Sequence, residues 1–295
     1  MNNQKVVRKM NAATKPGSKL LAWILMLGVL GLVSAGSEPA QASGAKAKLR
    51  VLTYNVFVGF KNDSKRHAKA VKWIAAQHPD VVVLQELNDY TEEKLSQDAR
   101  AWGHPYAKLC VTQSGYHLGL TSRKPIENVH LIVKRGICHG MIHGQTHGID
   151  FFVLHLAPQS EEARMPETEL ILTEIRGIQS PERPAILLGD FNSSSPLDAG
   201  YFRQKPKHQP KFNVMTRYLD SGYVDLVHQH QGVLTEKQAS VPTRLGRKDD
   251  GFWRLDYVLA SREFAKRCIA AQVVKDSETH YLSDHYPLIA DFSWR

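Results

Sequence analysis

The sequence predicts an α/β fold in which two β-sheets pack face to face and helices cover their outer faces. Eight short runs are rich in β-branched and aromatic residues, which is the composition of strands. Most of these runs are apolar at nearly every position, so each strand needs cover on both faces. Segments whose apolar residues recur at helical spacing lie between some of the runs. Two stacked sheets with helices outside satisfy both requirements.

The predicted elements follow one another without an intervening linker. The eight strands are, in order, LRVLTYNV, DVVVLQE, YHLGLTS, VHLIVKRG, IDFFVLHLA, AILLGD, WRLDYVLAS and PLIADFSW. A helix is predicted from Ser64 to a point before Pro79, because apolar residues recur there at helical spacing. A second helix is predicted after Pro166, since proline suits a first helical turn. No repeat or low-complexity segment follows the N-terminal region, so residues 43–295 are expected to form one domain.

The first 42 residues have the pattern of a secretory signal peptide and a short linker. Five basic residues precede the apolar run LLAWILMLGVLGLV, residues 20–33, and the small-residue sites VSA and AQA follow it. The apolar run has 14 residues, fewer than the ~20 that usually span a bilayer. We therefore expect cleavage after Ala35 or Ala42 and a secreted or periplasmic protein. The alternative is an uncleaved membrane anchor through residues 20–33, which would be the only membrane contact.

Charge and cysteine content narrow the classes of function. Cleavage would remove five basic residues and one acidic residue, which lowers the formal net charge from +9 to +5. A mildly basic protein suits an anionic partner such as nucleic acid or a phospholipid surface. Cys110, Cys138 and Cys268 allow at most one disulfide, and their spacing fits no zinc site. One bridge and one buried thiol would suit an exported protein, although the spacing does not identify the pair.

Several apolar runs end in hydrophilic residues that a buried strand does not favour. A carboxylate or an imidazole is costly to bury unless it is paired or bound to metal. Each residue alone has a structural explanation, such as a turn, a buried ion pair or a core histidine. Gathered at one edge of a sandwich, all of them would form an oxygen-rich pocket for a divalent cation and a phosphate ester. These residues are Asn55, Glu86, His155, Asp190, Asn192, Asp256, Asp284 and His285.

Six blocks in the order LTYNV, LQE, HLAP, GDFN, RLDYVL and SDHYP resemble the endonuclease/exonuclease/phosphatase superfamily. The resemblance covers essentially the whole chain after the N-terminal segment. It implies a four-layered α/β sandwich of two mostly antiparallel sheets flanked by helices, with the site at one edge. It also implies hydrolysis of phosphoesters, with Mg²⁺ or alternatively Mn²⁺ as the cofactor.

The resemblance assigns the metal and the attacking water to five of the polar residues. Glu86 would be the principal Mg²⁺ ligand, and Asn55 would support the metal or the phosphate. Asp284 would complete the metal and charge network. Asp190 would orient or deprotonate the attacking water, while Asn192 would hold that water or a phosphate oxygen.

The resemblance also implies that two histidines act on the phosphate. His155 and His285 would bind and polarise it, one of them transferring a proton, and Asp256 would fix the tautomer of His285. Pancreatic-type deoxyribonucleases pair each catalytic histidine with an acid. Residues 101–126, the region that would supply the acid for His155, contain no Asp or Glu. The sequence departs from that pattern, so His155 is expected to act only as a donor to the phosphate.

Three weaker signals remain. Tyr116 and His117 precede the strand LGLTS, where abasic-site enzymes carry a substrate-facing aromatic residue, so both are candidate substrate contacts. The basic loop FRQKPKHQPKF, residues 202–212, is expected to be exposed and could contact a polyanion. Three histidines recur every four residues among glycines that disfavour a helix, which predicts a strand, a turn near GQTHG and a return strand. On that interpretation they lie on a solvated face and do not form a metal site; they are His139, His143 and His147.

These observations lead to a first hypothesis and three alternatives. The first is a secreted, Mg²⁺-dependent nuclease that cleaves phosphodiesters of nucleic acid as a monomer, without an obligate protein partner. The basic charge favours it, and the sequence shows no obvious lipid-inserting aromatic hairpin. The alternatives are a sphingomyelinase-type lipid phosphodiesterase, an inositol-phosphate phosphatase, and a protein that binds phosphate in the same pocket without catalysis.

Overall fold

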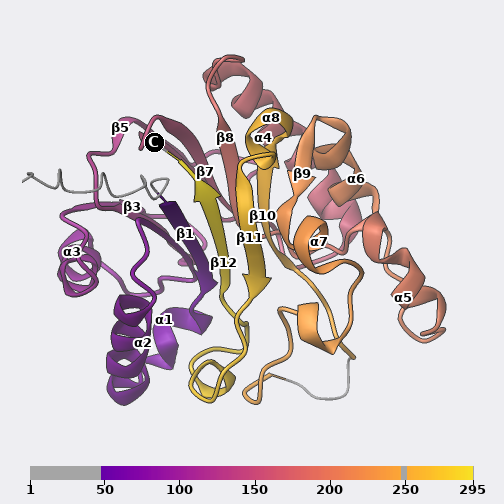
Figure 1. Ribbon diagram of the computed structural model, residues 1–295, viewed down its shortest axis with the longest axis horizontal. Coiled ribbons are helices and arrows are strands. Elements are labelled where there is room, and N and C mark those ends of the chain that lie inside the picture. The colour runs from indigo at the N-terminus through magenta and orange to yellow at the C-terminus, as the bar shows by residue number, and fades with distance from the viewer. Residues whose placement is uncertain (1–47, 247–250, 295) are drawn as a thin grey trace, which may run out of the picture. The chain divides into compact units, whose positions relative to one another are not determined.

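The computed structural model describes residues 48–246 and 251–294, which form two six-stranded sheets and the helices around them. Sheet A contains, in spatial order, β11 (Cys268–Val273), β12 (Leu288–Ser293), β1 (Lys48–Asn55), β2 (Val81–Gln85), β4 (Leu118–Ser122) and β3 (Tyr106–Cys110). Sheet B contains β5 (Glu127–Ile132), β6 (Met141–Thr146), β7 (Ile149–His155), β8 (Ala185–Asp190), β10 (Asp256–Ser261) and β9 (Tyr223–Asp225). The two sheets lie face to face (Figure 1).

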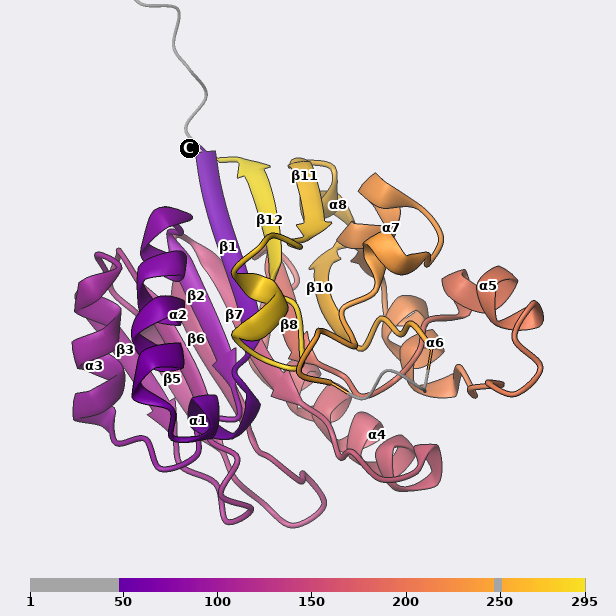
Figure 2. The same ribbon diagram turned by 90° about the horizontal axis from the view of Figure 1, so that it is seen from below.

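Helices cover the outer face of each sheet, which gives the predicted four layers (Figure 2). Sheet A is covered by α2 (Ser64–Ala76) and α3 (Glu92–Ala101), and sheet B by α4 (Glu161–Ile178) and α6 (Asn213–Asp220). The shorter helices lie in the connections: α1 (Phe57–Lys61), η1 (Pro196–Asp198), α5 (Ala199–Arg203), α7 (Leu226–Gln231), η2 (Glu236–Gln238), α8 (Arg262–Ala265) and η4 (Thr279–Tyr281). The α/β sandwich expected from the sequence is confirmed.

The apolar strands are buried on both faces, as their composition predicts. Val51, Val83, Phe151 and Leu188 pack between the sheets, and each is fully buried. Residues one position away along the same strands, such as Leu52, turn outward and pack under the helices. The predicted strands are therefore present, whereas β3, β9 and β11 at the sheet edges were not predicted.

Most neighbouring strands run antiparallel, and the two parallel pairs determine where the site forms. In sheet A, β1 runs parallel to β2, and in sheet B, β7 runs parallel to β8. Parallel strands end at the same edge of a sheet. A hydrogen bond from Asn55 at the end of β1 to Asp190 at the end of β8 shows that both pairs end at the same edge of the sandwich. The polar residues that follow these strands in the sequence are brought to that edge.

The predicted helix boundaries are correct for one helix and wrong for the other. Helix α2 begins at Ser64, where the Asp63 side chain accepts hydrogen bonds from the backbone N–H groups of Lys65 and Arg66. Helix α4 begins at Glu161, five residues before Pro166. The proline sits in the second turn, where one backbone hydrogen bond is lost, and two glutamates in the first turn favour the earlier start electrostatically.

The three cysteines are free thiols, so the expected single disulfide is absent. Cys110 ends β3 and Cys268 begins β11, and these are the two outermost strands of sheet A, too far apart for a bridge. Cys138 lies in the loop before β6 of the other sheet.

Among the described residues no helix is both long and apolar enough to cross a bilayer. The predicted signal peptide and anchor, residues 1–42, lie outside the described residues.

Candidate active site

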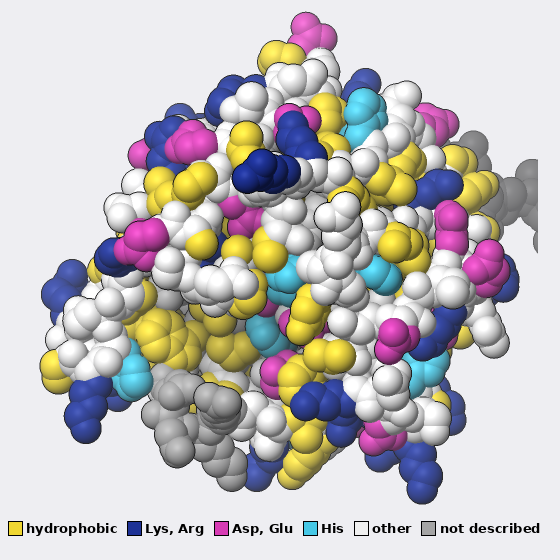
Figure 3. All heavy atoms as spheres, turned by 180° about the vertical axis from the view of Figure 1, so that it is seen from behind, with side chains coloured by type: hydrophobic (Ala, Val, Ile, Leu, Met, Phe, Trp, Pro, Cys, Tyr) yellow, Lys and Arg dark blue, Asp and Glu magenta, His cyan; other side chains and the backbone are white. Residues whose placement is uncertain are grey.

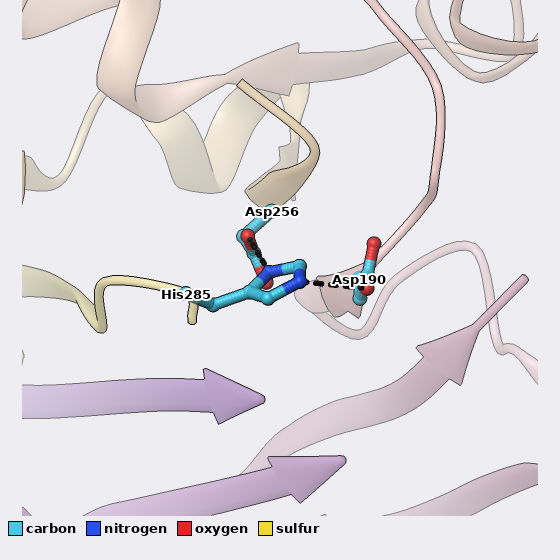
Figure 4. A group of neighbouring side chains, drawn as sticks. All are labelled: Asp190, Asp256 and His285. Atoms are coloured by element: carbon cyan, nitrogen blue, oxygen red, sulfur yellow. Dashed lines mark hydrogen bonds and ion pairs between the residues drawn. The ribbon is translucent and has the colours of Figure 1, made fainter. Parts of the chain in front are cut away.

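The polar residues predicted from the strand ends meet at one edge of the sandwich. Asn55 ends β1, Glu86 follows β2, His155 ends β7 and Asp190 ends β8. The antiparallel strand β10 begins directly opposite the end of β8, and the loop before β12 completes the group. That register brings in Asp256, and the loop brings in Asp284 and His285; Figure 4 shows Asp190, Asp256 and His285 side by side.

A glycine makes the end of β8 possible. Gly189 has φ +138°, and a Cβ at this position would lie 1.9 Å from the carbonyl oxygen of Leu154 in β7. Only glycine permits this approach, which sets His155 opposite Asp190 in the β7–β8 register. The sequence GDFN therefore combines a required glycine with the carboxylate that it positions.

One amide links the carboxylates of the two sheets. Asn55 Nδ2 donates to Glu86 Oε1 at 3.0 Å and to Asp190 Oδ2 at 3.1 Å. The other oxygen of Glu86 accepts from the backbone N–H of Val58 at 2.8 Å. Burial raises the pKa of both carboxyl groups, and nearby Asp256 adds to the shift at Asp190 while His285 opposes it. The cluster concentrates acidic groups that hydrogen-bond to amides and backbone N–H groups.

His285 is the cation of the site. Its Nδ1 lies 2.8 Å from Asp256 Oδ2, and its Nε2 lies 3.8 Å from Asp190 Oδ2 (Figure 4). Burial disfavours the charged ring, but the carboxylates of Asp256 and Asp190 outweigh burial and raise the pKa of His285 well above its ordinary value. Asp256 therefore orients the ring and keeps a proton on the nitrogen that faces the site.

His155 has a different environment. It is buried, its Nε2 lies 3.7 Å from Asp190 Oδ2, and its Nδ1 has no hydrogen-bond partner among the described residues. Burial, followed by the charges of His139 and His285, lowers its pKa well below the ordinary value. Its neighbour is aromatic: His139 stacks on it with ring centroids 4.3 Å apart and an interplanar angle of 25°. The ring is neutral and is held by stacking, in keeping with the acid-free stretch 101–126.

Asn192 and Ser283 fasten the loops that carry the site. The backbone N–H of Asn192 donates to Asp190 Oδ1 at 2.8 Å, and its side chain donates to the Leu156 carbonyl at 2.9 Å. Ser283 Oγ donates to the Asn55 carbonyl at 2.6 Å, which ties the loop of Asp284 to β1. Burial raises the pKa of Asp284, whose side chain lines the adjacent cavity. Residues from separate strand ends and loops of both sheets thus form one site.

A left-handed turn supports Glu86 and was not predicted. Residues 57–62 all have positive φ angles, as does Glu86 itself at +60°. The turn closes on the Glu86 backbone, because Gly59 N–H donates to the Glu86 carbonyl at 2.7 Å. A Cβ at Gly59 would lie 2.5 Å from the carbonyl oxygen of Asn88. The signals in the sequence are only Gly59 and Asn62, since Phe57 and Val58 disfavour this conformation.

Of the two candidate substrate contacts, Tyr116 touches site residues, whereas His117 bonds to a neighbouring loop residue. Tyr116 lies at the site, with its ring edge-on to His139 at 5.0 Å and to His155 at 6.2 Å. His117 accepts a hydrogen bond from Thr112 N–H, and none of its hydrogen bonds to described residues reaches the acidic cluster. The role of both in substrate binding stays a prediction. The basic loop 202–212 is largely exposed, as expected.

The prediction for the three spaced histidines is correct in backbone and wrong in exposure. Strands β6 and β7 form the expected hairpin with its turn at His147 and Gly148. His139 is buried against His155, and His143 is buried with its Nε2 2.8 Å from Asp150 Oδ1. A Cβ at Gly144 would lie 2.8 Å from the Ile126 side chain, so this glycine permits close packing and does not mark a solvated face. His139 is thus a site residue that the spacing did not reveal.

A cavity of about 730 Å³ opens beside the acidic cluster. Asn192 and Asp284 line it together with Arg164, Ser193, Trp253 and Leu255. Figure 3 shows hydrophobic surface on this face of the molecule, with histidine and acidic side chains next to it. A substrate whose phosphorus lies at the acidic cluster has room to extend into this cavity.

The ligand atoms of Asp190, Asp256 and His285 lie within 4.8 Å of one another, so this buried group could hold a metal ion.

Solved structures with the same fold include an AP endonuclease from Archaeoglobus fulgidus, with 18% identity and a TM-score of 0.66. The match covers 83% of this chain and 99% of that chain. A variant of the 3′ phosphatase NExo from Neisseria, bound to product DNA hairpin, has 22% identity and a TM-score of 0.65. The 3′-5′ exonuclease NExo from Neisseria meningitidis has 22% identity and a TM-score of 0.63. Both cover 83% of this chain and 100% of their own.

A direct comparison with curated proteins found no match. The family model described as "Endonuclease/Exonuclease/phosphatase family" matches residues 52–285, which include every clustered polar residue from Asn55 to His285. The chain therefore belongs to the endonuclease/exonuclease/phosphatase family and is a metal-dependent hydrolase of phosphoesters.

Proposed function

We propose that this protein is a nuclease that uses Mg²⁺ to hydrolyse phosphodiester bonds of nucleic acid. The observation that carries the proposal is the convergence of Glu86, Asp190 and His285 beside a cavity large enough for a nucleotide. Acidic oxygens and a protonated imidazole are the groups that hydrolysis of an anionic ester requires. The structural neighbour from Neisseria bound to a DNA hairpin supports nucleic acid as the substrate.

A divalent cation fits the acidic side of the site. Asp190 is buried, Glu86 is partly buried, and the two are linked through Asn55, so a bound cation would relieve the energetic cost that raises their pKa values. The Nδ1 of His285 already bonds to Asp256, so we assign the ion to Glu86, with Asn55 and Asp284 in support. When bound, Mg²⁺ would neutralise the phosphate and stabilise the leaving oxygen.

The other site residues have separate roles in the proposed reaction. Asp190, held by Asn55 and by the backbone N–H of Asn192, is placed to orient the attacking water and accept its proton. His285, kept protonated by Asp256, donates from Nε2 to a phosphate oxygen, where negative charge develops. His155 is neutral and contributes one hydrogen bond through Nε2. The side chain of Asn192 holds a phosphate oxygen.

A substrate panel tests the proposal. Plasmid DNA, single-stranded RNA, sphingomyelin vesicles and inositol polyphosphates are each incubated with Mg²⁺, with Mn²⁺ or with a chelator. We expect chelator-sensitive cleavage of nucleic acid and no turnover of the lipid or the inositol phosphates. Preferred turnover of sphingomyelin or an inositol phosphate would replace the nuclease assignment with that activity. Phosphate binding without any hydrolysis would indicate a non-catalytic protein.

Export is a separate proposal, supported by the basic and apolar pattern of residues 1–42. Expression of the full chain in a bacterial host, followed by N-terminal sequencing of the protein outside the cytoplasm, would test it. We expect a mature chain that begins after Ala35 or Ala42. Retention of the intact chain in the membrane fraction would favour the anchor.

A further inference from the structure

The cavity beside the acidic cluster contains hydrogen-bond donors that the proposed chemistry does not use. It opens between the start of α4, the turn that follows Asp190 and the segment around Trp253. Asn192 and Asp284 belong to both the cavity and the candidate active site. A ligand group in the cavity therefore lies next to the phosphorus that is attacked.

Arg164 lines this cavity with part of its guanidinium unpaired. Its Nη1 donates to the carbonyls of Ala157 and Gln159 at 3.1 and 2.8 Å, which fixes the group beside the loop that follows His155. Its Nε is buried and has no hydrogen-bond partner among the described residues. Burial lowers the pKa of Arg164, and Asp190 is among the carboxylates whose charges raise it, so the two groups are within electrostatic range. An arginine stays charged in proteins, so a half-buried cation lines the cavity.

Ser193 supplies a second unpaired donor in the same cavity. It is 4% exposed, and its Oγ is buried without a hydrogen-bond partner in the part of the chain that the structure describes. Its position is fixed, because its carbonyl accepts a hydrogen bond from the hydroxyl of Tyr257 at 2.9 Å. A buried donor without a partner costs roughly 1–3 kcal/mol, so two such donors in one cavity indicate a ligand with several acceptor oxygens.

The acidic residues at the start of α4 are already occupied. Glu162 forms an ion pair with Lys211, and Glu161 accepts a hydrogen bond from Asn213 Nδ2 at 2.6 Å. Arg164, by contrast, hydrogen-bonds only to backbone carbonyls among the described residues. Glu161 keeps its negative charge, but both glutamates already have a hydrogen-bond donor, so among the described charged groups at the start of α4 it is Arg164 that has an unpaired donor for a ligand.

We propose that Arg164 and Ser193 bind a second phosphate group of the substrate, the neighbour of the phosphate that is hydrolysed. The proposal rests on the proposed nuclease function and specifies its substrate further. A guanidinium and a hydroxyl match the oxygens of a phosphate in geometry and charge. The enzyme would thus select a chain with successive phosphates over an isolated phosphodiester.

Three dinucleotides that differ only in terminal phosphate test the subsite. We compare kcat/KM for thymidylyl-thymidine without a terminal phosphate, with a 5′-phosphate and with a 3′-phosphate. We expect the wild-type enzyme to prefer one phosphorylated form by about 10- to 100-fold, the range given by charge-assisted hydrogen bonds. In Arg164→Gln this ratio should approach one, and in Arg164→Lys it should be intermediate, because lysine keeps the charge without the planar fork.

The control is Arg176→Gln, which removes an exposed arginine near the other end of the same helix. It should keep the wild-type ratio, and circular dichroism should show that all variants are folded. Equal rates of the wild-type enzyme on the three dinucleotides, or an unchanged ratio in Arg164→Gln, would overturn the subsite while leaving the nuclease function intact.

Failure to cleave any dinucleotide or longer nucleic acid would instead overturn the nuclease function. The subsite would then be tested by calorimetric binding of thymidine 3′,5′-bisphosphate to the full chain. We expect Arg164→Gln to weaken this binding at least about tenfold. Equal Kd values for wild type and variant would overturn the subsite by itself.

Discussion

At the two edges of the sandwich the pKa values of carboxyl groups shift in opposite directions. At the edge where β1 begins, Arg50 forms a bidentate pair with Asp291 at 2.7 and 3.0 Å, and Lys48 adds a third contact to the same carboxylate. The Arg50 backbone N–H donates to Asp80. Burial opposes ionisation of Asp291, but the hydrogen bonds from Arg50 and Lys48 outweigh it and hold its pKa below the ordinary value.

At the edge where β1 ends, the carboxylates have no such lysine or arginine partners among the described residues. Glu86 and Asp190 share the amide of Asn55, and the cation that faces Asp190 is the imidazole of His285 at 3.8 Å. Here the effect of burial exceeds that of the hydrogen bonds and of the His285 charge, so the pKa values of both carboxyl groups are raised. The Asp291 carboxylate at the opposite edge is thus neutralised by basic side chains, whereas the carboxylates at the site edge would gain from a bound cation.

The largest expected effect is on catalysis, and one substitution at each edge measures it. Asp190→Asn should lower kcat by about 10²- to 10⁴-fold on the substrate that the panel identifies, because it removes the group that we propose orients and deprotonates the attacking water. Asp291→Asn, at the opposite edge, should stay within about twofold of wild type. Steady-state kinetics on both purified variants provide the comparison. An Asp190→Asn enzyme within about tenfold of wild type would remove this carboxylate from the mechanism.

The same two variants should change stability in opposite directions. Asp291→Asn breaks charged hydrogen bonds to Arg50, so we expect it to lower the free energy of unfolding by about 2 kcal/mol. A carboxyl whose pKa is raised on folding destabilises the native state at neutral pH. Asp190→Asn should therefore raise the free energy of unfolding by about 1 kcal/mol in metal-free buffer. Urea unfolding with a chelator present measures both, and a loss of stability in Asp190→Asn would contradict the account of the site edge.

The acidic cluster could be predicted from the sequence, whereas His139 and the edge strands could not. The residues of the acidic cluster were found because each interrupts an apolar run, a local property that needs no knowledge of contacts. His139 was missed because its stacking on His155 joins two segments that the sequence keeps apart. Strands β3 and β11 were missed because a sheet edge is covered on fewer sides, so its apolar pattern is weak. Tertiary pairing determines these features.

The next largest expected effect is on the pH dependence of stability, through a buried histidine near the opposite edge. His104 bonds to Thr121 and to the Pro79 carbonyl, and burial lowers its pKa to about 4. As the pH falls below the unfolded value of about 6.5, the unfolded chain takes up the proton first, so stability is lost. Between pH 7 and pH 5 this histidine should cost about 2 kcal/mol of unfolding free energy.

His104→Gln isolates that contribution. The variant should be less stable than wild type at pH 7, because the buried hydrogen bonds are altered, but its stability should fall less between pH 7 and pH 5. Chemical denaturation at the two pH values gives the difference. An identical fall in both proteins would show that His104 does not titrate over this range.

The stacked histidine of the site edge should have a smaller effect, on rate. His139→Ala removes the ring that holds His155, so we expect kcat to fall about three- to tenfold with KM nearly unchanged. His139→Phe keeps a stacking ring and should recover most of the lost rate. A loss in the phenylalanine variant as large as that in the alanine variant would indicate that the imidazole nitrogens of His139 matter, and that His139 does more than position its neighbour.

The smallest expected effect concerns backbone strain, which is also distributed unevenly between the edges. At the opposite edge residues with positive φ form only short turns, at His78 and at the pair His147 and Gly148, whereas six in succession form the turn 57–62 beside Glu86. Val58 has φ 51° and ψ 55°, a conformation that a β-branched residue disfavours and asparagine tolerates. Val58→Asn should therefore raise the free energy of unfolding by about 0.5 kcal/mol, while Val58→Ile, which keeps the branch, should leave it unchanged. If the asparagine variant is no more stable than the isoleucine variant in urea unfolding, packing of Val58 outweighs its strain, and the site edge owes its cost to charge alone.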